Sequence, residues 1–183
     1  MPRPTVVSPD ELVEALMRVV AGRGLDVVSM RTVAAEAGVS TGAVQNRFAT
    51  KDALLRAAYE RVIEQFAERV AHHAALGLSP RAFRRALLLE LLPLDAQREA
   101  ELRVAMAFTA RSMHSPPLTS LYTHGYERLV AAVETTLEGD DPRRDARAAV
   151  AVADGLAWHM LCAPAAIGPD QAVAALDAHL AML

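Results

Sequence analysis

One stretch of the chain, residues 29–52, constrains the fold more than any other. It reads SMRTVAAEAGVSTGAVQNRFATKD and contains two short amphipathic segments on either side of a glycine. Ser29 and Ser40 are candidate helix N-caps, because a serine hydroxyl can accept a hydrogen bond from a free backbone N–H of the first turn. Gly38 supplies the left-handed residue at which helices commonly end. The spacing predicts two short helices, the second over 41–48, joined by a tight turn.

Two short helices with a glycine-containing turn are typical of the helix-turn-helix, whose second helix lies in the major groove of DNA. Val44 and Phe48, four residues apart, are expected on the inner face of that helix. Its outer face lacks a carboxylate. Amides there can bond adenine, and an arginine can bond guanine or phosphate. We expect DNA contacts from Arg31, Thr32, Ser40, Thr41, Gly42, Ala43, Gln45, Asn46, Arg47 and Lys51.

The only lysine of the chain, Lys51, follows this motif directly. Thr50 is a candidate N-cap of the next helix, which would place Lys51 in a first turn. Free N–H groups, the helix dipole and a cation together favour a phosphate there. An ordinary helical hairpin would explain the apolar inner face equally well. It would not explain a carboxylate-free outer face beside a lysine.

Residues 8–60 resemble the DNA-binding domain of the TetR family of one-component regulators. The resemblance is carried by MRTVAAEAGVS at 30–40, and by Gly42, Phe48, Lys51, Leu54 and Leu55. This chain has Gln45 and Arg47 where family members commonly carry tyrosine or histidine. The resemblance implies a homodimer that binds double-stranded operator DNA and responds to a small-molecule effector.

Composition and charge restrict the fold class and the partners. The chain is 52% hydrophobic and 4% aromatic, with many alanines and leucines, which favours an all-α fold. Residues 1–60 hold seven basic and seven acidic side chains, so a positive patch must come from their arrangement. An architectural DNA binder without a ligand, our alternative reading, would need stronger positive charge.

The single cysteine and the short apolar runs indicate the compartment. Cys162 cannot form an intramolecular disulfide, which fits a reducing cytosol, and we expect it to be a small buried residue rather than a redox sensor. No apolar run approaches the length of a membrane span or a signal peptide. We expect a cytoplasmic protein without a membrane partner.

Caps, glycines and prolines predict about nine helices. Ser8 and Pro9 begin the first helix, while residues 1–7 form an arm with Arg3 that is a disordered tail or, less favoured, a minor-groove contact. We expect a helix-turn-helix domain at 1–55 and a ligand-binding and dimerisation domain at 56–183. The later helices are expected at 51–76, 80–92, 95–114, 117–138, 142–163 and 169–183. Residues 87–101 and 169–183 resemble the C-terminal domain of a BetI-like branch of the TetR family.

The second domain contains candidates for a ligand cavity. Methionines and aromatics with a few polar tips suit an adaptable apolar site, although a plain core is the alternative for each residue. We expect the ligand to contact Met106, Thr109, Met113, Tyr126 and Trp158. Glu90 is expected to pair with an arginine rather than with a cationic ligand. His72 and His73 are expected on the surface, without a metal.

The last two predicted helices carry apolar faces with small side chains. We expect these faces to meet a second copy in a four-helix interface, the alternative being a purely intramolecular core. The expected interface residues are Ala149, Val152, Ala153, Leu156, Ala157, Met160, Leu176 and Leu180.

Catalytic motifs do not occur in the sequence. It has no serine elbow, HExxH, CxxC, phosphate loop or suitably paired carboxylates, and we expect neither an enzyme nor a cofactor. The combined reading is a ligand-responsive transcriptional regulator. We expect a repressor that a small molecule releases from a near-palindromic operator.

Overall fold

The computed structural model describes residues 7–24 and 26–183, and its regular structure there consists of α-helices alone. The expected all-α fold is confirmed, whereas Arg3 lies outside the described residues. The helices are α1 (Pro9–Arg23), α2 (Met30–Glu36), α3 (Thr41–Gln45), α4 (Lys51–Ala75), α5 (Pro80–Leu89), α6 (Ala96–Ser112), α7 (Pro116–Glu134), α8 (Pro142–Cys162) and α9 (Pro169–Leu180). Within this part of the chain, no helix is both long and apolar enough to cross a membrane.

Local sequence chemistry sets the helix ends. The Ser8 hydroxyl accepts from the Glu11 amide at 3.1 Å, and the Ser8 amide donates to the Glu11 carboxylate at 2.7 Å. The Thr50 hydroxyl accepts from the first turn of α4 in the same way. Gly38, with φ of +69°, provides the left-handed residue between α2 and α3. These expected caps and this turn are confirmed.

Helix α3, which the sequence predicted as the recognition helix, is shorter than the expected 41–48. It ends at Gln45, and the chain continues as a turn in which the Phe48 amide donates to the Val44 carbonyl at 2.9 Å. This turn keeps Phe48 on the inner side, where only 9% of it is exposed, while Val44 is fully buried. The apolar side of α3 is therefore as expected, although the regular helix is not.

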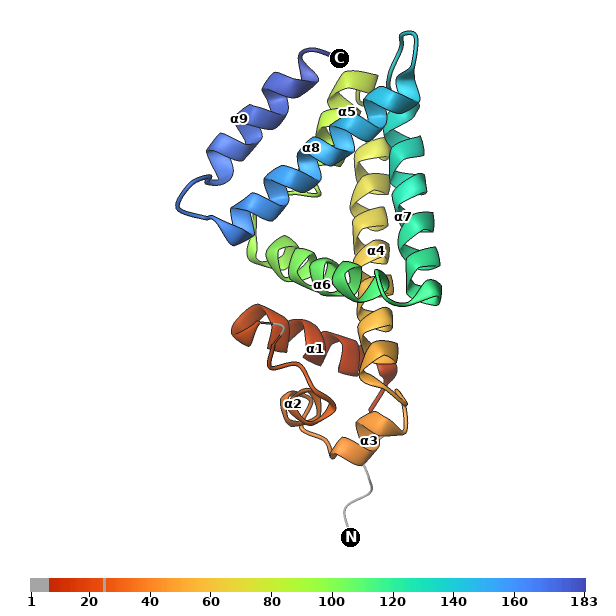
Figure 1. Cartoon of the computed structure of the whole chain (residues 1–183), viewed down its shortest axis with the longest axis vertical. Helices are drawn as coiled ribbons and strands as arrows, with labels where there is room; N and C mark the ends of the chain where they lie inside the picture. Colours follow the sequence, from red (N-terminus) through yellow and green to blue (C-terminus); the bar gives the residue numbers. More distant parts are fainter. Residues whose placement is uncertain (1–6, 25) are drawn as a thin grey trace.

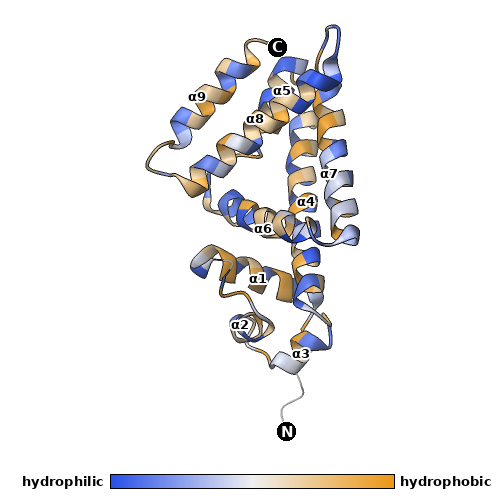
Figure 2. Ribbon diagram, viewed as in Figure 1, coloured by the Kyte–Doolittle hydropathy of each residue, from blue (hydrophilic) through white to orange (hydrophobic). Residues whose placement is uncertain are grey.

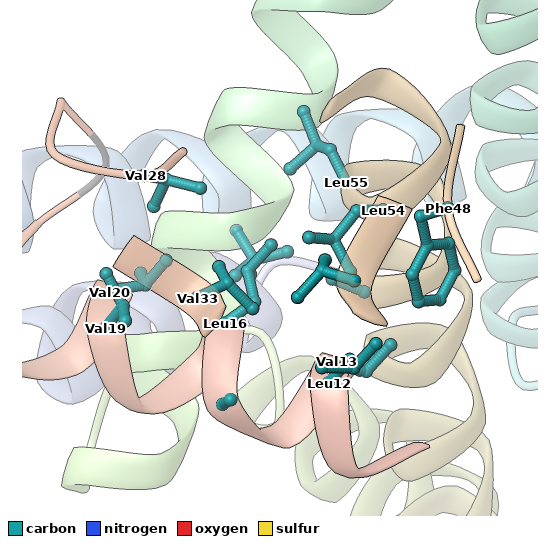
Figure 3. Close-up of a cluster of buried hydrophobic side chains, with 14 of the residues drawn as sticks. Leu12, Val13, Leu16, Val19, Val20, Val28, Val33, Phe48, Leu54 and Leu55 are labelled. Carbon is teal, nitrogen blue, oxygen red and sulfur yellow. The ribbon is translucent and has the colours of Figure 1, made fainter. Parts of the chain in front are cut away.

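The core beneath the helix-turn-helix extends into the second half of the chain. Leu12, Leu16 and Val33 are fully buried there (Figure 3). The same cluster includes Val104 and Phe108 of α6. Figure 2 shows α1 coloured as hydrophobic along most of its length, and α1 packs against both α2 and α6. The domain boundary near residue 55 stays a prediction, because α4 continues through it without a break.

A second core lies among α5, α7, α8 and α9 and includes Leu87, Val130, Val150 and Leu176. In Figure 1 the long helix α4 runs from the end of the molecule that holds α3 to the end that holds α5. Its 25 residues span about 37 Å at about 1.5 Å per residue. A single rigid element thus connects the two ends of the molecule.

Candidate functional site

The outer face of α3 is presented to solvent at one end of the molecule. Gln45, Asn46 and Arg47 are exposed, as are Ser40 and Gly42. The Ser40 hydroxyl accepts from the Ala43 amide at 3.1 Å, so it caps α3 as well as lying beside the exposed face. Burial of Val44 and Phe48 on the opposite side fixes which side chains point outward.

Several of the other expected DNA contacts have structural partners. The Thr32 hydroxyl accepts from the Ser29 amide and donates to the Val27 carbonyl, both at 2.8 Å, so it is committed to the start of α2. Ala43 is half-buried and packs against the core. Thr32 and Thr41 are also half-buried, whereas Arg31 is exposed. Arg47 donates through Nε to the Val7 carbonyl at 3.1 Å. This bond holds its guanidinium at the edge of α3.

Lys51 is exposed in the first turn of α4. The next residue, Asp52, is an acid whose negative charge is paired with an arginine. The Asp52 carboxylate accepts from Arg111 at the end of α6, with Nη2–Oδ2 at 2.8 Å and Nε–Oδ1 at 3.0 Å. The neighbouring carboxylate therefore does not neutralise Lys51. The same ion pair joins the first turn of α4 to the end of α6.

A cavity of about 380 Å³ lies between α4, α6, α7 and α8. This volume is in the range of small-molecule sites. All five residues expected to contact a ligand line it together, namely Met106, Thr109, Met113, Tyr126 and Trp158. Tyr122 of α7 also lines it, and sequence reasoning missed Tyr59 of α4 and Asp154 of α8, which do so too.

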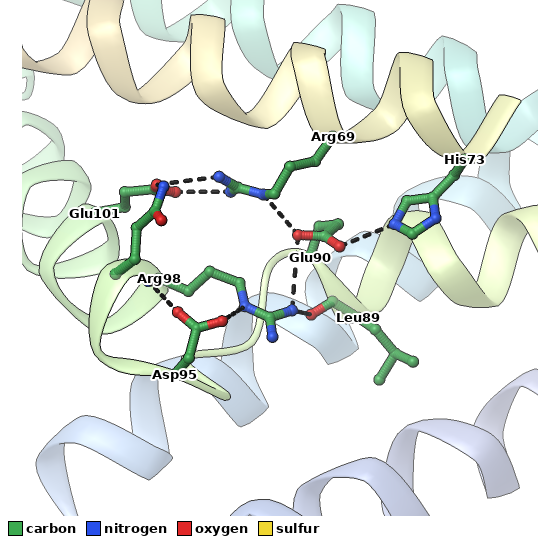
Figure 4. Close-up of polar contacts among 8 residues, drawn as sticks. Arg69, His73, Leu89, Glu90, Asp95, Arg98 and Glu101 are labelled. Carbon is green, nitrogen blue, oxygen red and sulfur yellow. Dashed lines mark hydrogen bonds and ion pairs between the residues drawn. The ribbon is translucent and has the colours of Figure 1, made fainter. Parts of the chain in front are cut away.

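Paired charges form part of the cavity lining (Figure 4). Arg69 donates to both oxygens of the buried Glu101 carboxylate, at 3.0 and 2.7 Å, and through Nε to Glu90 at 2.7 Å. Glu90 also lies 2.9 Å from Nε2 of His73 and 3.6 Å from Nη1 of Arg98. The expected pairing of Glu90 with arginine is confirmed.

His73 does not lie on the open surface that we expected for both histidines. It is half-buried against Glu90, because α4 turns it toward the loop between α5 and α6. His72, the next residue on the helix, is exposed as expected.

Asp154 of α8 also lines the cavity. It makes no ion pair within the described part of the chain. Burial of its carboxyl group raises the pKa of Asp154 to about 6, although the residue as a whole is exposed. Burial also raises the pKa of Tyr59 to about 12, and the Tyr59 ring stacks on Phe108 with centroids 3.9 Å apart.

Six of the eight expected interface residues are instead part of the chain's own core. Ala149, Ala153, Ala157, Met160, Leu176 and Leu180 are at most 8% exposed. Packing of α8 against α9, α7 and α5 covers them, so the expectation that they meet a second copy is wrong. Val152 and Leu156 remain half-buried and retain some accessible surface.

The opposite side of α8 is the accessible one. Ala148, Ala151, Gly155, His159 and Cys162 recur there at helical spacing, and all are exposed except the half-buried Gly155. Cys162 is thus exposed, contrary to the expected burial, because it lies on this outer stripe. On α9 the exposed positions include Ala174, Ala175, Ala178 and Ala181.

Comparison with known proteins covers both halves of the chain. Residues 12–58 match the model for bacterial regulatory proteins of the tetR family, and residues 80–183 match the model for the C-terminal part of BetI-type transcriptional repressors. The HTH-type transcriptional regulator PksA of Bacillus subtilis is 31% identical over 88% of this chain and 82% of its own length.

Two solved structures are similar over nearly the whole chain. A transcriptional regulator from Rhodococcus sp. Rha1 has a TM-score of 0.88 at 32% identity, covering 96% of this chain and 95% of that one. The multidrug binding protein EbrR in complex with imidazole has a TM-score of 0.71 at 31% identity, covering 96% and 94%.

Proposed function

We propose, from the premise that the chain belongs to the TetR family of regulators with a BetI-type C-terminal domain, that it represses transcription until a small molecule fills its cavity. One observation carries the proposal. The helix that presents Lys51 beside the recognition helix also forms a wall of the cavity through Tyr59, Ile63 and Phe66. A change in the cavity therefore acts on the same rigid element that orients the DNA-facing end.

The relatives support the assignment of the cavity as an effector site. EbrR was crystallised with imidazole, and its 31% identity extends over both domains. In this chain the corresponding domain contains a preformed cavity lined mostly by apolar and aromatic side chains, the usual character of a ligand site. A ligand releases DNA only if it binds better to a conformation that is unsuited to the operator.

The regulator acts as a homodimer in this proposal. Two recognition helices then read half-sites about 34–36 Å apart, as twofold helix-turn-helix proteins do. Apart from His159, the exposed stripe of α8 and the exposed alanines of α9 carry small side chains, so two copies can approach closely through them. The proposed dimer contact is therefore this exposed stripe, and not the buried face of α8 that the sequence suggested.

Signal transfer depends on the link between α6 and α4. Met106 and Thr109 of α6 line the cavity, and Arg111 two residues later pairs with Asp52 beside Lys51. Movement of α6 on ligand binding is transmitted through this pair and through the packing of α6 on α1. The coupling needed is modest, since about 1–3 kcal/mol changes affinity about 5- to 150-fold.

Substitutions on the DNA-facing surface are expected to separate two kinds of contact. Arg47→Ala and Lys51→Ala should weaken binding to all duplexes and lower the salt dependence by about one unit per lost phosphate contact. Gln45→Ala should instead relax base preference, by about 1–3 kcal/mol per lost bidentate pair. Fluorescence anisotropy with duplexes selected from a random library measures both effects.

The control is Arg81→Ala, which removes the same charge from an exposed position on α5 in the other domain. It should leave affinity and salt dependence unchanged. If Gln45→Ala selected the same preferred duplex as the unmodified protein, the assignment of base reading to Gln45 would be wrong.

A further inference from the structure

The lining of the cavity is open to solvent around Trp158 of α8. Only four large apolar side chains in the described part of the chain are more than half exposed, and two of them, Met113 at 71% and Trp158 at 52%, line this cavity. Asp154, four residues before Trp158, is exposed as well. By contrast, Tyr59 and Glu101 in the same lining are only 8% and 4% exposed. The single chain therefore leaves the cavity incomplete at α8.

Trp158 also borders the exposed stripe of α8. Residues three and four apart on a helix are neighbours on its surface. Gly155 precedes Trp158 by three residues and Cys162 follows it by four, and both belong to the stripe. Asp154, a neighbour of Trp158 on the same helix, belongs to the cavity lining instead. The edge of the cavity and the edge of the stripe thus meet at one tryptophan.

The surface beside this tryptophan is poor in charge. None of residues 148–183 is a lysine or an arginine, and the acids among them are Asp154, Asp170 and Asp177. Asp177 already pairs with Arg85 of α5. In Figure 1, α9 forms an outer edge of the molecule and packs on α8. Depletion of charged residues is typical of the core of an interface between identical subunits.

A second copy of the chain fits this surface better than a charged partner does. In a twofold contact the same stripe faces itself, so small neutral side chains meet small neutral side chains. The large apolar side chain at the edge of the stripe, Trp158, is then covered from the other subunit. Such burial is favourable, because tryptophan removes much apolar surface from water.

We propose that the second copy completes the cavity, its α8 covering the open side at Trp158 and forming a wall of the effector site. This inference rests on the proposed function in taking a homodimer through α8 and α9 and an effector in the cavity. It adds that a bound ligand contacts both copies. Ligand binding and dimerisation are then linked, since such a ligand binds the dimer more tightly than the monomer.

The test uses Trp158 itself, because it is the only tryptophan of the chain and its fluorescence reports its exposure. Acrylamide quenching and the emission maximum are measured over a dilution series, and analytical ultracentrifugation gives the dimer fraction at each concentration. Dimer formation should lower the Stern–Volmer quenching constant at least about threefold and shift the emission to shorter wavelength.

Ala174→Arg should dissociate the dimer from an exposed position on α9, without a change in the helix that carries Trp158. Its quenching should match that of the diluted protein at every concentration. Ala131→Arg is the matched control, because it adds the same charge at an exposed alanine of α7, at the edge of the molecule opposite α9 in Figure 1. It should dimerise and protect Trp158 as the unmodified protein does. Circular dichroism checks the helical content of both variants.

The neutral apolar dye N-phenyl-1-naphthylamine tests the linkage. It should bind the unmodified dimer at least about fivefold more tightly than the Ala174→Arg protein, and saturation with the dye should strengthen dimerisation, because linkage is reciprocal. Gly125→Leu, whose side chain enters the cavity near Ile63 and Tyr59, identifies the part of the binding that occurs in the cavity.

Three results would overturn the inference and leave a dimeric regulator intact: equal quenching of Trp158 in a demonstrated dimer and in the monomer, equal dye affinity of the two, or no dye binding in the cavity of the dimer. A protein that stays monomeric at all concentrations would overturn both the inference and the proposed homodimer. Binding of a selected duplex by the dye-free protein tests the proposed function separately, since failure to bind above non-specific affinity would contradict it even if Trp158 were covered.

Discussion

Ala153→Arg is expected to unfold the C-terminal helices rather than only separate two subunits. Ala153 is fully buried between α8 and its neighbours, in the cluster that contains Ala149 and Leu176. An arginine there places an unpaired charge in an apolar core and also overfills it. The cost should be roughly 3–5 kcal/mol or more, a large fraction of a typical domain's stability. Urea unfolding monitored by circular dichroism measures it.

Gly155→Arg, two residues away on the same helix, is the matched control. A Cβ added at Gly155 meets no heavy atom within 4 Å, so the side chain can extend from the accessible stripe. The stability of each protomer should not fall, and it should rise by up to about 1 kcal/mol because arginine favours a helix interior more than glycine does. Light scattering should nevertheless show dissociation, because the bulky cation lies in the proposed dimer contact.

The two outcomes together identify the face of α8 that meets a partner. An Ala153→Arg protein that keeps its full stability but becomes monomeric would contradict the burial-based assignment. So would a Gly155→Arg protein that remains a stable dimer.

Arg69→Met is expected to have the second largest effect. The Arg69 side chain bridges Glu90 and Glu101, and the Glu101 side chain is only 5% exposed. Removing the arginine leaves the buried Glu101 carboxylate with the neutral Gln97 amide as its donor, at 3.0 Å, while Glu90 keeps His73 and Arg98 nearby. Loss of one partner from a buried ion pair costs about 3–5 kcal/mol, which urea unfolding should detect.

Arg103→Met tests whether this effect is specific to burial. Arg103 pairs with Glu99 on the exposed side of α6, with side chains 37% and 46% exposed. Such surface pairs contribute about 0–1 kcal/mol. A double variant with Arg69→Met and Glu101→Leu should recover much of the stability, since it removes the buried charges together. Equal losses of stability in the Arg69→Met and Arg103→Met proteins would contradict a special contribution of the buried ion pairs.

Local signals predicted the helix boundaries well where a cap or glycine acts within a few residues. Ser8, Gly38 and Thr50 each work through contacts to their own neighbours, so the sequence alone contains the cause. The end of α3 was harder to predict. The chain passes from helix to turn after Gln45 while keeping the same apolar residues inward.

The buried side of α8 could not be chosen from periodicity. Alanines occur on both sides of this helix, with Ala148 and Ala151 outside and Ala149 and Ala153 inside. Only the packing of α5, α7 and α9 distinguishes them, and that packing depends on residues far apart in the chain. Cys162 was misplaced for the same reason.

The cavity was partly predictable. The methionines and aromatics with polar tips that suggested an apolar site do line one cavity, together with the expected Thr109. Asp154 had a usable signal that was missed: it is the only charged residue between Arg147 and His159. Its isolation from the arginines, however, depends on how α4, α6 and α8 pack together.

Coupling between the cavity and the DNA-facing surface is best measured by calorimetry on one ligand, with and without DNA. The ligand should be a compound that stabilises the unmodified protein but not Gly125→Leu, a variant whose side chain enters the cavity near Ile63 and Tyr59. Saturation with a selected near-palindromic duplex should weaken binding of that ligand by about 5- to 150-fold, because linkage is reciprocal. Equal ligand affinity with and without the duplex would contradict a ligand-controlled regulator.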